Sequence, residues 1–434
     1  MMYIDNILFA VVLFVGIGFF AKNVIKLKRN INLGHDVNRN DNPAARWKNM
    51  AIIALGQSKM VRRPIAGFLH VVVYVGFVVI NLEVLEIILD GLLGTHRIFS
   101  FLGGFYGFLI GSFEILAVLV LVAVLIFWIR RNVIKLKRFA SSDLKGSPKK
   151  DADIILYFEV VLMSLFLIMN AFDLQFQGLN SGNIISRFLA PSPQAFSLIS
   201  VEIIERLAWW LHIIGILIFL NYLYYSKHLH ILLAFPNTYF ADLNPQGQFD
   251  NVKSVTSEVK IMMNPDAEPF AGQTVDANLV PLKFGASDVQ DLNWVQLLNA
   301  YTCTECGRCT SVCPANMTGK KLSPRKIMMD TRDRMEEVGK NIDFNNGVFV
   351  PDAKSLLNDY ITAEELWACT SCNACVEECP VNINPLSIIM DMRRYLVMEQ
   401  SAAPQPINAM MANIENNGAP WQFSQQDRLN WKNE

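Results

Sequence analysis

The chain has 434 residues, of which 52% are hydrophobic and 18% are charged, and its formal net charge at pH 7 is −1. With a positive mean hydropathy, this composition is too apolar for a soluble protein of this length, so a membrane domain is predicted. A net charge near zero favours neither a nucleic acid nor an acidic partner.

Five apolar segments are long enough to cross about 30 Å of hydrocarbon. The first segment has Asp5 instead of a basic residue at its start and has no small-residue cleavage site, so it is predicted to be a retained span and not a signal peptide. Residues 1–235 are therefore predicted to form an all-α membrane bundle with its two ends on opposite sides of the membrane. The spans are Ile4–Val24, Ile65–Leu89, Phe105–Ile129, Ile154–Phe172 and Leu207–Tyr225.

Basic residues are distributed unevenly over the loops of this bundle. The segment from Lys22, at the inner end of the first span, to Arg63 carries ten Lys and Arg residues, and the loop between the third and fourth spans carries eight. Of the other two loops, one carries only Arg97, and the other carries Arg187 and, directly before the fifth span, Arg206. By the positive-inside rule, the N-terminus lies outside and everything after Tyr225 lies in the cytoplasm. The predicted location is a bacterial cytoplasmic (inner) membrane.

Three connecting segments have distinct compositions. Arg46–Met60 is amphipathic and is predicted to lie at the membrane interface. Residues 173–200 contain Gly, Asn, Ser and Pro, which predicts an irregular cover over the outer ends of the helices. Residues 236–290 are polar with little periodicity and are predicted to be a linker. The remaining residues, 291–434, are predicted to form a mainly α domain.

The eight cysteines of the chain all lie in two copies of one motif, C-x2-C-x2-C-x3-C-P, at Cys303–Pro314 and Cys369–Pro380. Bacterial-type ferredoxins hold [4Fe–4S] clusters with this spacing, and the fourth cysteine of each motif ligates the cluster of the other motif. The spacing therefore predicts two crossed clusters. The first is assigned to Cys303, Cys306, Cys309 and Cys379, and the second to Cys369, Cys372, Cys375 and Cys313.

A pair of zinc knuckles is the alternative interpretation of these cysteines. Zinc prefers four ligands in two pairs, a spacing that these motifs do not have. No cysteine remains for a disulfide, and cluster assembly requires a reducing compartment, so the domain is predicted to be cytoplasmic. The loop charges and the cysteine chemistry thus independently place it on the same side.

Histidines near the ends of spans are candidate haem ligands, because imidazole is a common axial ligand. His212 and His230 are 18 residues apart; on a straight helix they would face the same way about 27 Å apart. His70, at the inner start of the second span, is the predicted partner of His230 on an inner haem. The alternatives are His228 as the inner ligand, although a straight helix would turn it about 160° away, and a purely interfacial role for His70.

His212 is the predicted first ligand of an outer haem. The second span has Ile80 and Asn81 at the matching depth, so His96, in the following loop, is the candidate second ligand. If His96 is not the second ligand of the outer haem, the protein has one haem or an unusual outer ligand.

Carboxylates in the outer halves of the second and third spans are costly to bury in a membrane. A quinone site needs a proton acceptor near a redox centre, which makes Glu83 and Glu114 quinone-site candidates, with Glu86 close by. The alternative is structural pairing with Arg206.

Several segments resemble known families. GQSKMVRRPIAGFLH at 56–70, WLH at 210–212 and SKHLHI at 226–231 resemble the membrane cytochrome b of respiratory nitrate reductase gamma subunits. With the cysteine segments, they are still more similar to heterodisulfide-reductase-related membrane oxidoreductases, in which this cytochrome is fused to an iron–sulfur domain. The resemblance covers nearly the whole chain. It implies that His70 and His230 bind the inner haem and that His212 binds the outer one.

Two features depart from this resemblance. Ile80 stands where the gamma subunits carry a second histidine on the same span, which leaves the outer haem open. Many fused relatives continue past an NGxPW segment into a domain with CCG motifs, whereas the sequence given ends at Glu434 without such motifs. The resemblance therefore implies a soluble CCG-domain subunit as partner, possibly fed by an electron-transfer flavoprotein, with Arg393 and Arg394 as candidate contacts.

The preferred hypothesis is a membrane electron-transfer subunit of a quinone-linked oxidoreductase complex. It would use two [4Fe–4S] clusters and one or two haems b, with quinone as substrate. Neither GxGxxG nor GxxxxGK[ST] occurs, and no residue set predicts acid–base chemistry on a soluble substrate. No nucleic-acid partner is expected. The alternative is a membrane-anchored redox sensor or assembly anchor without net electron throughput.

Overall fold

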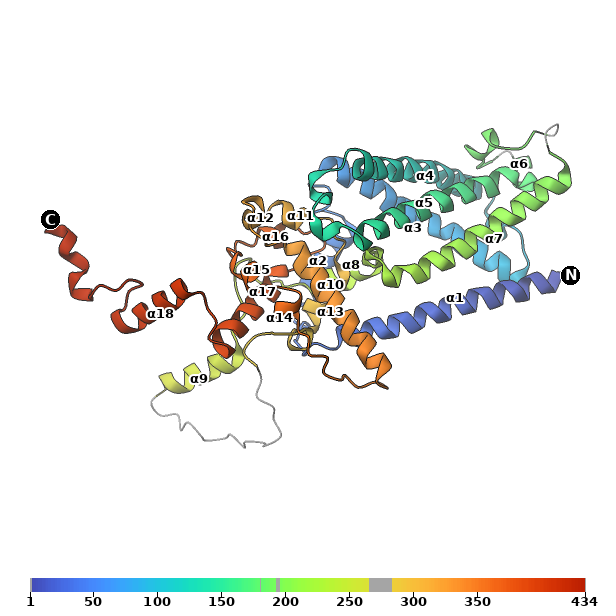
Figure 1. Ribbon diagram of the computed structural model, residues 1–434. Helices are drawn as coiled ribbons and strands as arrows, with labels where there is room; N and C mark the ends of the chain where they lie inside the picture. The colour runs from blue at the N-terminus through green and yellow to red at the C-terminus, as the bar shows by residue number, and fades with distance from the viewer. Residues whose placement is uncertain (1, 180, 193–195, 265–282, 434) are drawn as a thin grey trace.

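The computed structural model describes residues 2–179, 181–192, 196–264 and 283–433. The chain folds into a bundle of long helices and a smaller helical domain that packs against one end of the bundle (Figure 1). The described residues contain no β-strand, only the isolated bridges His35–Asn293 and Leu357–Ile361. We call the end of the bundle that contacts the smaller domain the near end, and the opposite end the far end.

Five helices in the described part of the chain are long and apolar enough to cross a membrane, as the sequence predicts. Each overlaps one predicted span, and several extend beyond it into polar or basic residues that hydropathy does not select. The five are α1 (Met2–Ile31), α3 (Pro64–Leu93), α4 (Gly104–Trp128), α5 (Ser147–Phe172) and α7 (Leu198–Tyr222).

Close helix contacts at glycines hold the bundle together. A Cβ at Gly76 of α3 would lie 2.5 Å from the side chain of Val120 in α4, and a Cβ at Gly91 would lie 2.6 Å from the ring of Phe9 in α1. Both distances are shorter than a carbon–carbon contact allows, so the helix backbones approach as closely as they do only because these residues lack side chains.

The segment after α7 is not the straight helix that the histidine spacing assumed. A 3-10 turn at Leu223–Tyr225 follows α7, Ser226 is extended (φ −116°, ψ 148°), and α8 begins only at His230 (His230–Tyr239). The Ser226 hydroxyl accepts a hydrogen bond from the His228 N–H at 3.1 Å and so stabilises the break. The rotation argument that links His212 to His230 is therefore wrong, because the helix is not continuous between them.

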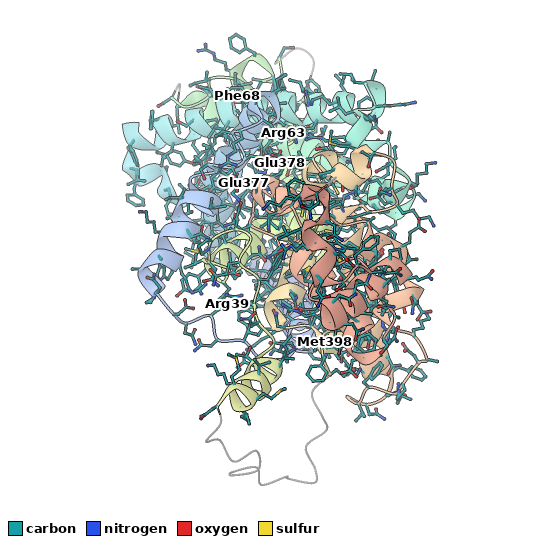
Figure 2. The ribbon with its side chains drawn as sticks, turned by 90° about the vertical axis from the view of Figure 1, so that its left-hand side faces the viewer. Arg39, Arg63, Phe68, Glu377, Glu378 and Met398 are labelled. Carbon is teal, nitrogen blue, oxygen red and sulfur yellow. The ribbon has the colours of Figure 1, made fainter. Side chains whose placement is uncertain are left out.

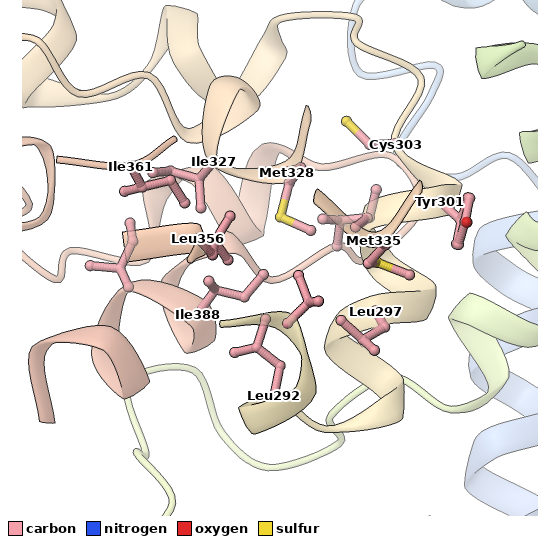
Figure 3. Packing of buried hydrophobic residues seen from close by; sticks show 14 of the residues in the cluster. Leu292, Leu297, Tyr301, Cys303, Ile327, Met328, Met335, Leu356, Ile361 and Ile388 are labelled. Atoms are coloured by element: carbon pink, nitrogen blue, oxygen red, sulfur yellow. The ribbon is translucent and has the colours of Figure 1, made fainter. Parts of the chain in front are cut away.

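The smaller domain, residues 283–433 as described, is built from short helices around the two cysteine motifs. Leu297, Ile327, Met335 and Ile388 are fully buried in its core (Figure 3). Its helices are α10 (Trp294–Thr302), α11 (Arg308–Ser311), α12 (Pro314–Met317), α13 (Pro324–Phe344), α14 (Leu356–Asp359), α15 (Ala363–Trp367), α16 (Ala374–Glu378), α17 (Pro385–Arg394) and α18 (Gln405–Asn417).

One buried apolar cluster runs from this domain into the near end of the bundle. It joins Leu297 and Met335 of the domain to Leu27 of α1, Phe219 of α7 and Leu229. Because the two parts share a core, the domain is docked on the bundle and is not merely tethered to it.

Two buried arginines fix the domain to the loops at the near end. Arg325 donates to the carboxylate of Asp143 at 2.7 and 3.0 Å and to the carbonyl of Arg138 at 2.9 Å. Arg308 donates to the carbonyl of Lys59 at 2.9 Å. Each thus joins a different loop of the bundle to the domain.

Ion pairs flank this interface. Arg63 pairs with Glu378 at 2.7 Å, and Arg62 pairs with Glu377 at 2.5 Å; Figure 2 shows Arg63 beside the two glutamates. Part of the basic charge that the positive-inside rule counts therefore binds acidic residues of the docked domain.

The connecting segments differ in part from the predictions. In α2 (Pro43–Met50), Arg46 is buried and donates to the carbonyls of Tyr239 and Ala241, so this side of the predicted interfacial segment faces protein. The predicted linker contains α9 (Lys253–Met263), and its residues 265–282 lie outside the described residues. The loop at the far end contains α6 (Leu174–Gly178). Helix α18 projects away from the domain (Figure 1).

Candidate redox centres

The two cysteine motifs adopt closely similar local structures. Each begins after a helix, turns through a left-handed residue, Gly307 (φ +71°) or Asn373 (φ +59°), and continues into a short helix that carries the third cysteine. A Cβ at Gly307 would lie 2.5 Å from the guanidinium of Arg325, so both the backbone angle and the space require glycine there.

A cavity lies between the two motifs. Cys303, Cys306 and Cys309 of the first motif line it together with Cys379 of the second, and Cys375 also contributes to its wall. Within the described residues, no three His, Cys, Asp or Glu side chains are placed to hold a single metal ion. All four cysteines predicted to ligate the first cluster thus line the cavity, and Cys375, assigned to the second cluster, lies at the same wall.

The remaining cysteines form a second group. Burial raises the pKa of the Cys375 thiol to about 12, and the nearby thiols of Cys369, Cys313 and Cys372 raise it further. Cys313 therefore lies with the second motif, although it belongs to the first in sequence. A cluster binds thiolates, so its positive iron would offset the cost that burial imposes on their charge. The donor sets fit two [4Fe–4S] clusters.

Backbone donors and exposure distinguish the two groups. The N–H of Ile383 donates to the sulfur of Cys379 at 3.3 Å, and the N–H of Ser371 donates to the sulfur of Cys369 at 3.4 Å. Hydrogen bonds of this kind and solvent exposure set the reduction potentials of iron–sulfur centres. Each group has two buried cysteines, Cys303 and Cys379 in the first and Cys313 and Cys375 in the second, but an exposed cysteine, Cys372, occurs only in the second group.

At the near end of the bundle, His70 of α3 faces His230 of α8. Their ring centroids are 6.4 Å apart, and the rings are tilted by 40°. An iron held between two imidazole nitrogens at about 2 Å from each, a usual metal–nitrogen distance, separates the ring centroids by roughly 6 Å. The spacing of the two rings therefore fits an iron between them.

The hydrogen bonding of the two rings leaves a nitrogen of each histidine available for a metal. His230 donates from Nδ1 to the carbonyl of Lys227 at 3.1 Å, which leaves its Nε2 free to bind a metal. Burial lowers the pKa of His230, so its imidazole is neutral, as a ligand must be. Nδ1 of His70 is buried and has no hydrogen-bond partner among the described residues.

His228 lies beside this pair, not turned away from it as the straight-helix argument predicted. Its ring is 5.3 Å from that of His230 and perpendicular to it, and its Nε2 lies 3.8 Å from Glu159 of α5. Burial lowers the pKa of His228 to about 3. The break at Ser226 accounts for this position.

At the far end, His212 and His96 make no contact with each other in the described part of the chain. His212 is buried in α7 with its ring 6.3 Å from that of Phe166. His96 lies in the loop after α3, and its Nε2 is 3.1 Å from Asp173. An outer haem on these two residues therefore stays a prediction.

A cavity of about 240 Å³ opens at the far end between α1, α3, α5 and α7. Glu83, His96 and Trp209 are among the residues that line it. Oε2 of Glu83 is buried and unpartnered among the residues that the structure describes. Glu86, by contrast, accepts hydrogen bonds from the Tyr106 hydroxyl and the Phe99 N–H, each at 2.9 Å.

Glu114 does not line this cavity. It accepts hydrogen bonds from the N–H groups of Ile185 and Ser186, at 2.7 and 3.1 Å, and from Asn170 at 3.2 Å. The geometry thus gives it an anchoring contact with the far-end loop. Arg206 pairs with its neighbour Glu205 and with neither quinone-site candidate.

Arg393 and Arg394, the predicted partner contacts, are engaged within the chain. Arg393 donates to the carbonyl of Leu366 at 2.6 Å and packs over the ring of Trp367, and Arg394 pairs with Asp391 at 2.8 Å. Their role as contacts for a partner stays a prediction.

Sequence reasoning missed one contact between the histidine segment and the first cysteine motif, the buried ion pair of Lys227 with Glu305. Both stand inside motifs that the sequence analysis used, SKHLHI and CTECGRC. Their pairing across 78 positions left no local signal.

Comparison with known proteins identifies the cysteine domain. Residues 302–383 match the family model described as a 4Fe-4S dicluster domain. The chain is 29% identical over 419 residues to the probable iron-sulfur-binding oxidoreductase FadF of Bacillus subtilis (strain 168), covering 89% of this chain and 54% of that protein. It is 27% identical over 430 residues to the EtfAB:quinone oxidoreductase of Syntrophomonas wolfei, covering 92% of this chain and 55% of that protein.

A shorter match, 34% identical over 174 residues, joins 37% of this chain to 26% of a probable membrane-anchored ferredoxin of Chromohalobacter salexigens. No solved structure matches the chain. The chain spans about half the length of the two relatives that it matches along most of its own length. Residues 302–383 are therefore similar to a 4Fe-4S dicluster domain, and the relatives that match most of the chain are named as oxidoreductases. The five long apolar helices indicate a membrane protein.

Proposed function

We propose that the chain is a membrane electron-transfer subunit that carries electrons between the quinone pool and a soluble partner, through two [4Fe–4S] clusters and one or two haems b. The observation that carries this proposal is the pair of facing rings, His70 and His230, at an iron-holding separation of 6.4 Å at the end of the bundle where the cysteine domain docks. An isolated ferredoxin anchor would have no use for such a pair. The proposed orientation places the near end in the cytoplasm.

In this proposal Cys303, Cys306, Cys309 and Cys379 hold the first cluster, and the other four cysteines hold the second. The bound clusters and haem supply one-electron transfer. The chain keeps water away from the first site, because Cys303 and Cys379 are buried. His70 and His230 orient the inner haem from two different helices, so the haem would also tie α3 to α8.

The far-end cavity is the proposed quinone site. Trp209, Trp210 and Phe9 line it and offer apolar surface to the quinone ring. The unpartnered Oε2 of Glu83 is placed to take a proton when a quinol is oxidised, or to return one when a quinone is reduced. His96, 40% exposed in its side chain and paired with Asp173, is placed to exchange that proton with water.

The proposed soluble partner is an iron–sulfur subunit with CCG motifs or an electron-transfer flavoprotein. A relative bears the name EtfAB:quinone oxidoreductase, which supports a partner of the second kind. The exposed Cys372 supports electron exit at the second cluster. The partner would therefore dock over the second cysteine motif.

Quinol-dependent reduction of the haem in the purified, full-length protein tests this function. We expect a menaquinol or ubiquinol analogue to change the haem absorption. Glu83→Gln should slow that change without altering haem content, whereas Glu86→Gln, whose parent carboxylate is already satisfied by two donors, should slow it less. A protein that contains clusters but no haem, or a haem that no quinol reduces, would contradict the proposal and favour a sensor or anchor.

A further inference from the structure

Glu305 stands between two cysteines of the first group and is buried. Its side chain is 3% exposed, and its backbone is left-handed (φ +54°), an unusual conformation for a residue other than glycine. One carboxylate oxygen pairs with Lys227 and the other with Arg332 at 2.9 Å. The turn between Cys303 and Cys306 therefore points a carboxylate away from the cavity and toward the bundle.

Lys227, the partner of Glu305, lies in the break between α7 and α8. Its side chain is 9% exposed, and its ammonium group also donates to the carbonyl of Pro148 at 2.7 Å. Asp151 lies 3.7 Å from the same ammonium and accepts a hydrogen bond from the Tyr222 hydroxyl at 2.7 Å. The buried part of the network contains two cations, Lys227 and Arg332, and two carboxylates, so its formal charges balance; Arg332 also pairs with the exposed Asp333 at 3.4 Å. Such balance is what a buried ionic network requires.

Each end of the Lys227–Glu305 pair contacts a proposed redox ligand. Burial raises the pKa of the Cys303 thiol to about 12, and the N–H of Glu305, which donates to this thiol, counteracts part of that rise. At the other end, the carbonyl of Lys227 accepts the hydrogen bond from Nδ1 of His230 at 3.1 Å. A path therefore runs from the sulfur of Cys303 to the ring of His230, in which these contacts alternate with the covalent bonds of Glu305 and of Lys227.

We propose that Lys227 and Glu305 form the bridge along which electrons pass between the first cluster and the inner haem, and that Lys227 holds the His230 ring in its ligating orientation. The inference rests on the proposed function, since it assumes that the cluster and the haem are bound. The step moves one electron between a reduced and an oxidised centre. No bond is made or broken, and no proton moves in the bridge.

Both residues are positioning residues, because they act through Cys303 and His230. A bridge of charge-assisted hydrogen bonds in a dry interior keeps its geometry fixed, since no water competes for the donors. If Lys227 and Glu305 only helped to dock the domain, loss of the ion pair of Arg62 with Glu377 on the same interface should slow electron transfer as much as loss of the Lys227–Glu305 pair. That pair is about half exposed and, within the described residues, has no recorded contact with a proposed ligand side chain, so it provides a control on the same interface.

The test uses the full-length protein with its cofactors and the variants Glu305→Gln and Lys227→Met, with Glu377→Gln as the control. Haem content and the low-spin paramagnetic resonance signal report on the His230 ligand. Cluster content and cluster resonance signals report on the cysteines. The rate of haem reduction after rapid reduction of the clusters by dithionite reports on the bridge.

We expect both bridge variants to retain clusters and to reduce the haem about tenfold or more slowly, because each leaves a buried charge without its partner and displaces the path from Cys303 to His230. Lys227→Met should also shift the haem resonance signal. Glu377→Gln should leave the rate and the signals as in the unmodified protein. Lys227→Arg, which keeps the charge, should recover much of the rate and separates the bridge from a general folding defect.

Wild-type rates and signals in Glu305→Gln and Lys227→Met, with both cofactors bound, would overturn the bridge while leaving the proposed function intact. An equal loss of rate in Glu377→Gln would also overturn it, because docking alone would then explain the effect. Absence of haem from the unmodified protein would overturn the proposed function itself, and the bridge with it.

Discussion

Replacing Arg325 with methionine should weaken the docking of the cysteine domain on the bundle. Arg325 has no exposed surface, and its guanidinium donates to Asp143 at 2.7 and 3.0 Å and to the carbonyl of Arg138 at 2.9 Å. Methionine fills a similar volume but leaves Asp143, whose side chain is only 9% exposed, without a cation.

The size of the effect follows from the burial of this pair. Removing one partner of a buried ion pair costs about 3–5 kcal/mol, because the remaining charge is uncompensated. A loss of about 1 kcal/mol lowers the unfolding midpoint by roughly 2–4 °C in a domain of 150–250 residues. The midpoint of the cysteine domain should therefore fall by about 6 °C or more.

Thermal unfolding in mild detergent, followed by loss of cluster absorption, measures this change. Lys321→Met is the matched control, since Lys321 forms an exposed ion pair with Glu364 on the same domain, with side chains 66% and 62% exposed. The control should leave the midpoint unchanged. If Arg325→Met and Lys321→Met had the same unfolding midpoint, the claim that Arg325 fixes the domain would be refuted.

The same ion pair predicts a dependence on pH. Burial raises the pKa of Asp143, but hydrogen bonds from Arg325 and Ser141 and the charge of Arg325 outweigh it, so the pKa lies below its usual value. A carboxylate whose pKa is lower in the folded than in the unfolded state contributes its full stabilisation at pH values above the unfolded-state pKa, near 4. This stabilisation disappears as the pH falls through the folded-state pKa. The unmodified protein should lose this stabilisation below pH of about 4, whereas Arg325→Met should show less of the dependence.

Three further predictions follow from the redox centres. Cys313→Ser should weaken the paramagnetic resonance signal of the second cluster more than that of the first, and loss confined to the first would refute the crossed ligands. His230→Ala should abolish the inner-haem absorption while iron–sulfur content stays near normal, and His228→Ala should retain that absorption; the opposite result would exchange the two assignments. Glu114→Gln should increase protease cleavage of the far-end loop without slowing quinol-dependent haem reduction, and a slowed reduction with an intact loop would return Glu114 to the quinone site.

The cysteine motifs show how far local spacing can determine a site. Three cysteines within seven positions must lie in one loop, and the proline after the fourth starts a new helix, so the sequence alone indicated a crossed arrangement. The structure groups Cys379 with the first motif around one cavity. Hydropathy likewise located the five long helices, because an apolar run of span length depends on composition and not on its neighbours.

The histidines show the limit of such reasoning. His230 faces His70, but the straight helix that was used to select it does not exist, because Ser226 breaks it. Glu83 and Glu114 each lie in the outer half of an apolar segment. The structure nevertheless places Glu83 in the wall of a cavity, whereas Glu114 accepts hydrogen bonds from the far-end loop. The hydrogen-bond partner of a buried carboxylate depends on the segment that packs against it. The periodicity of the helix that carries the carboxylate does not identify that segment.

The sequence by itself therefore located the five long apolar helices and the two cysteine motifs, since each is set by residues that are close together along the chain. Tertiary structure alone decided the contacts between the two parts. Lys227 and Glu305 are 78 positions apart, and Asp143 and Arg325 are 182 apart. The physical reason is that a buried charge is stable only beside its counter-charge, and docking of the domain brings these charges together.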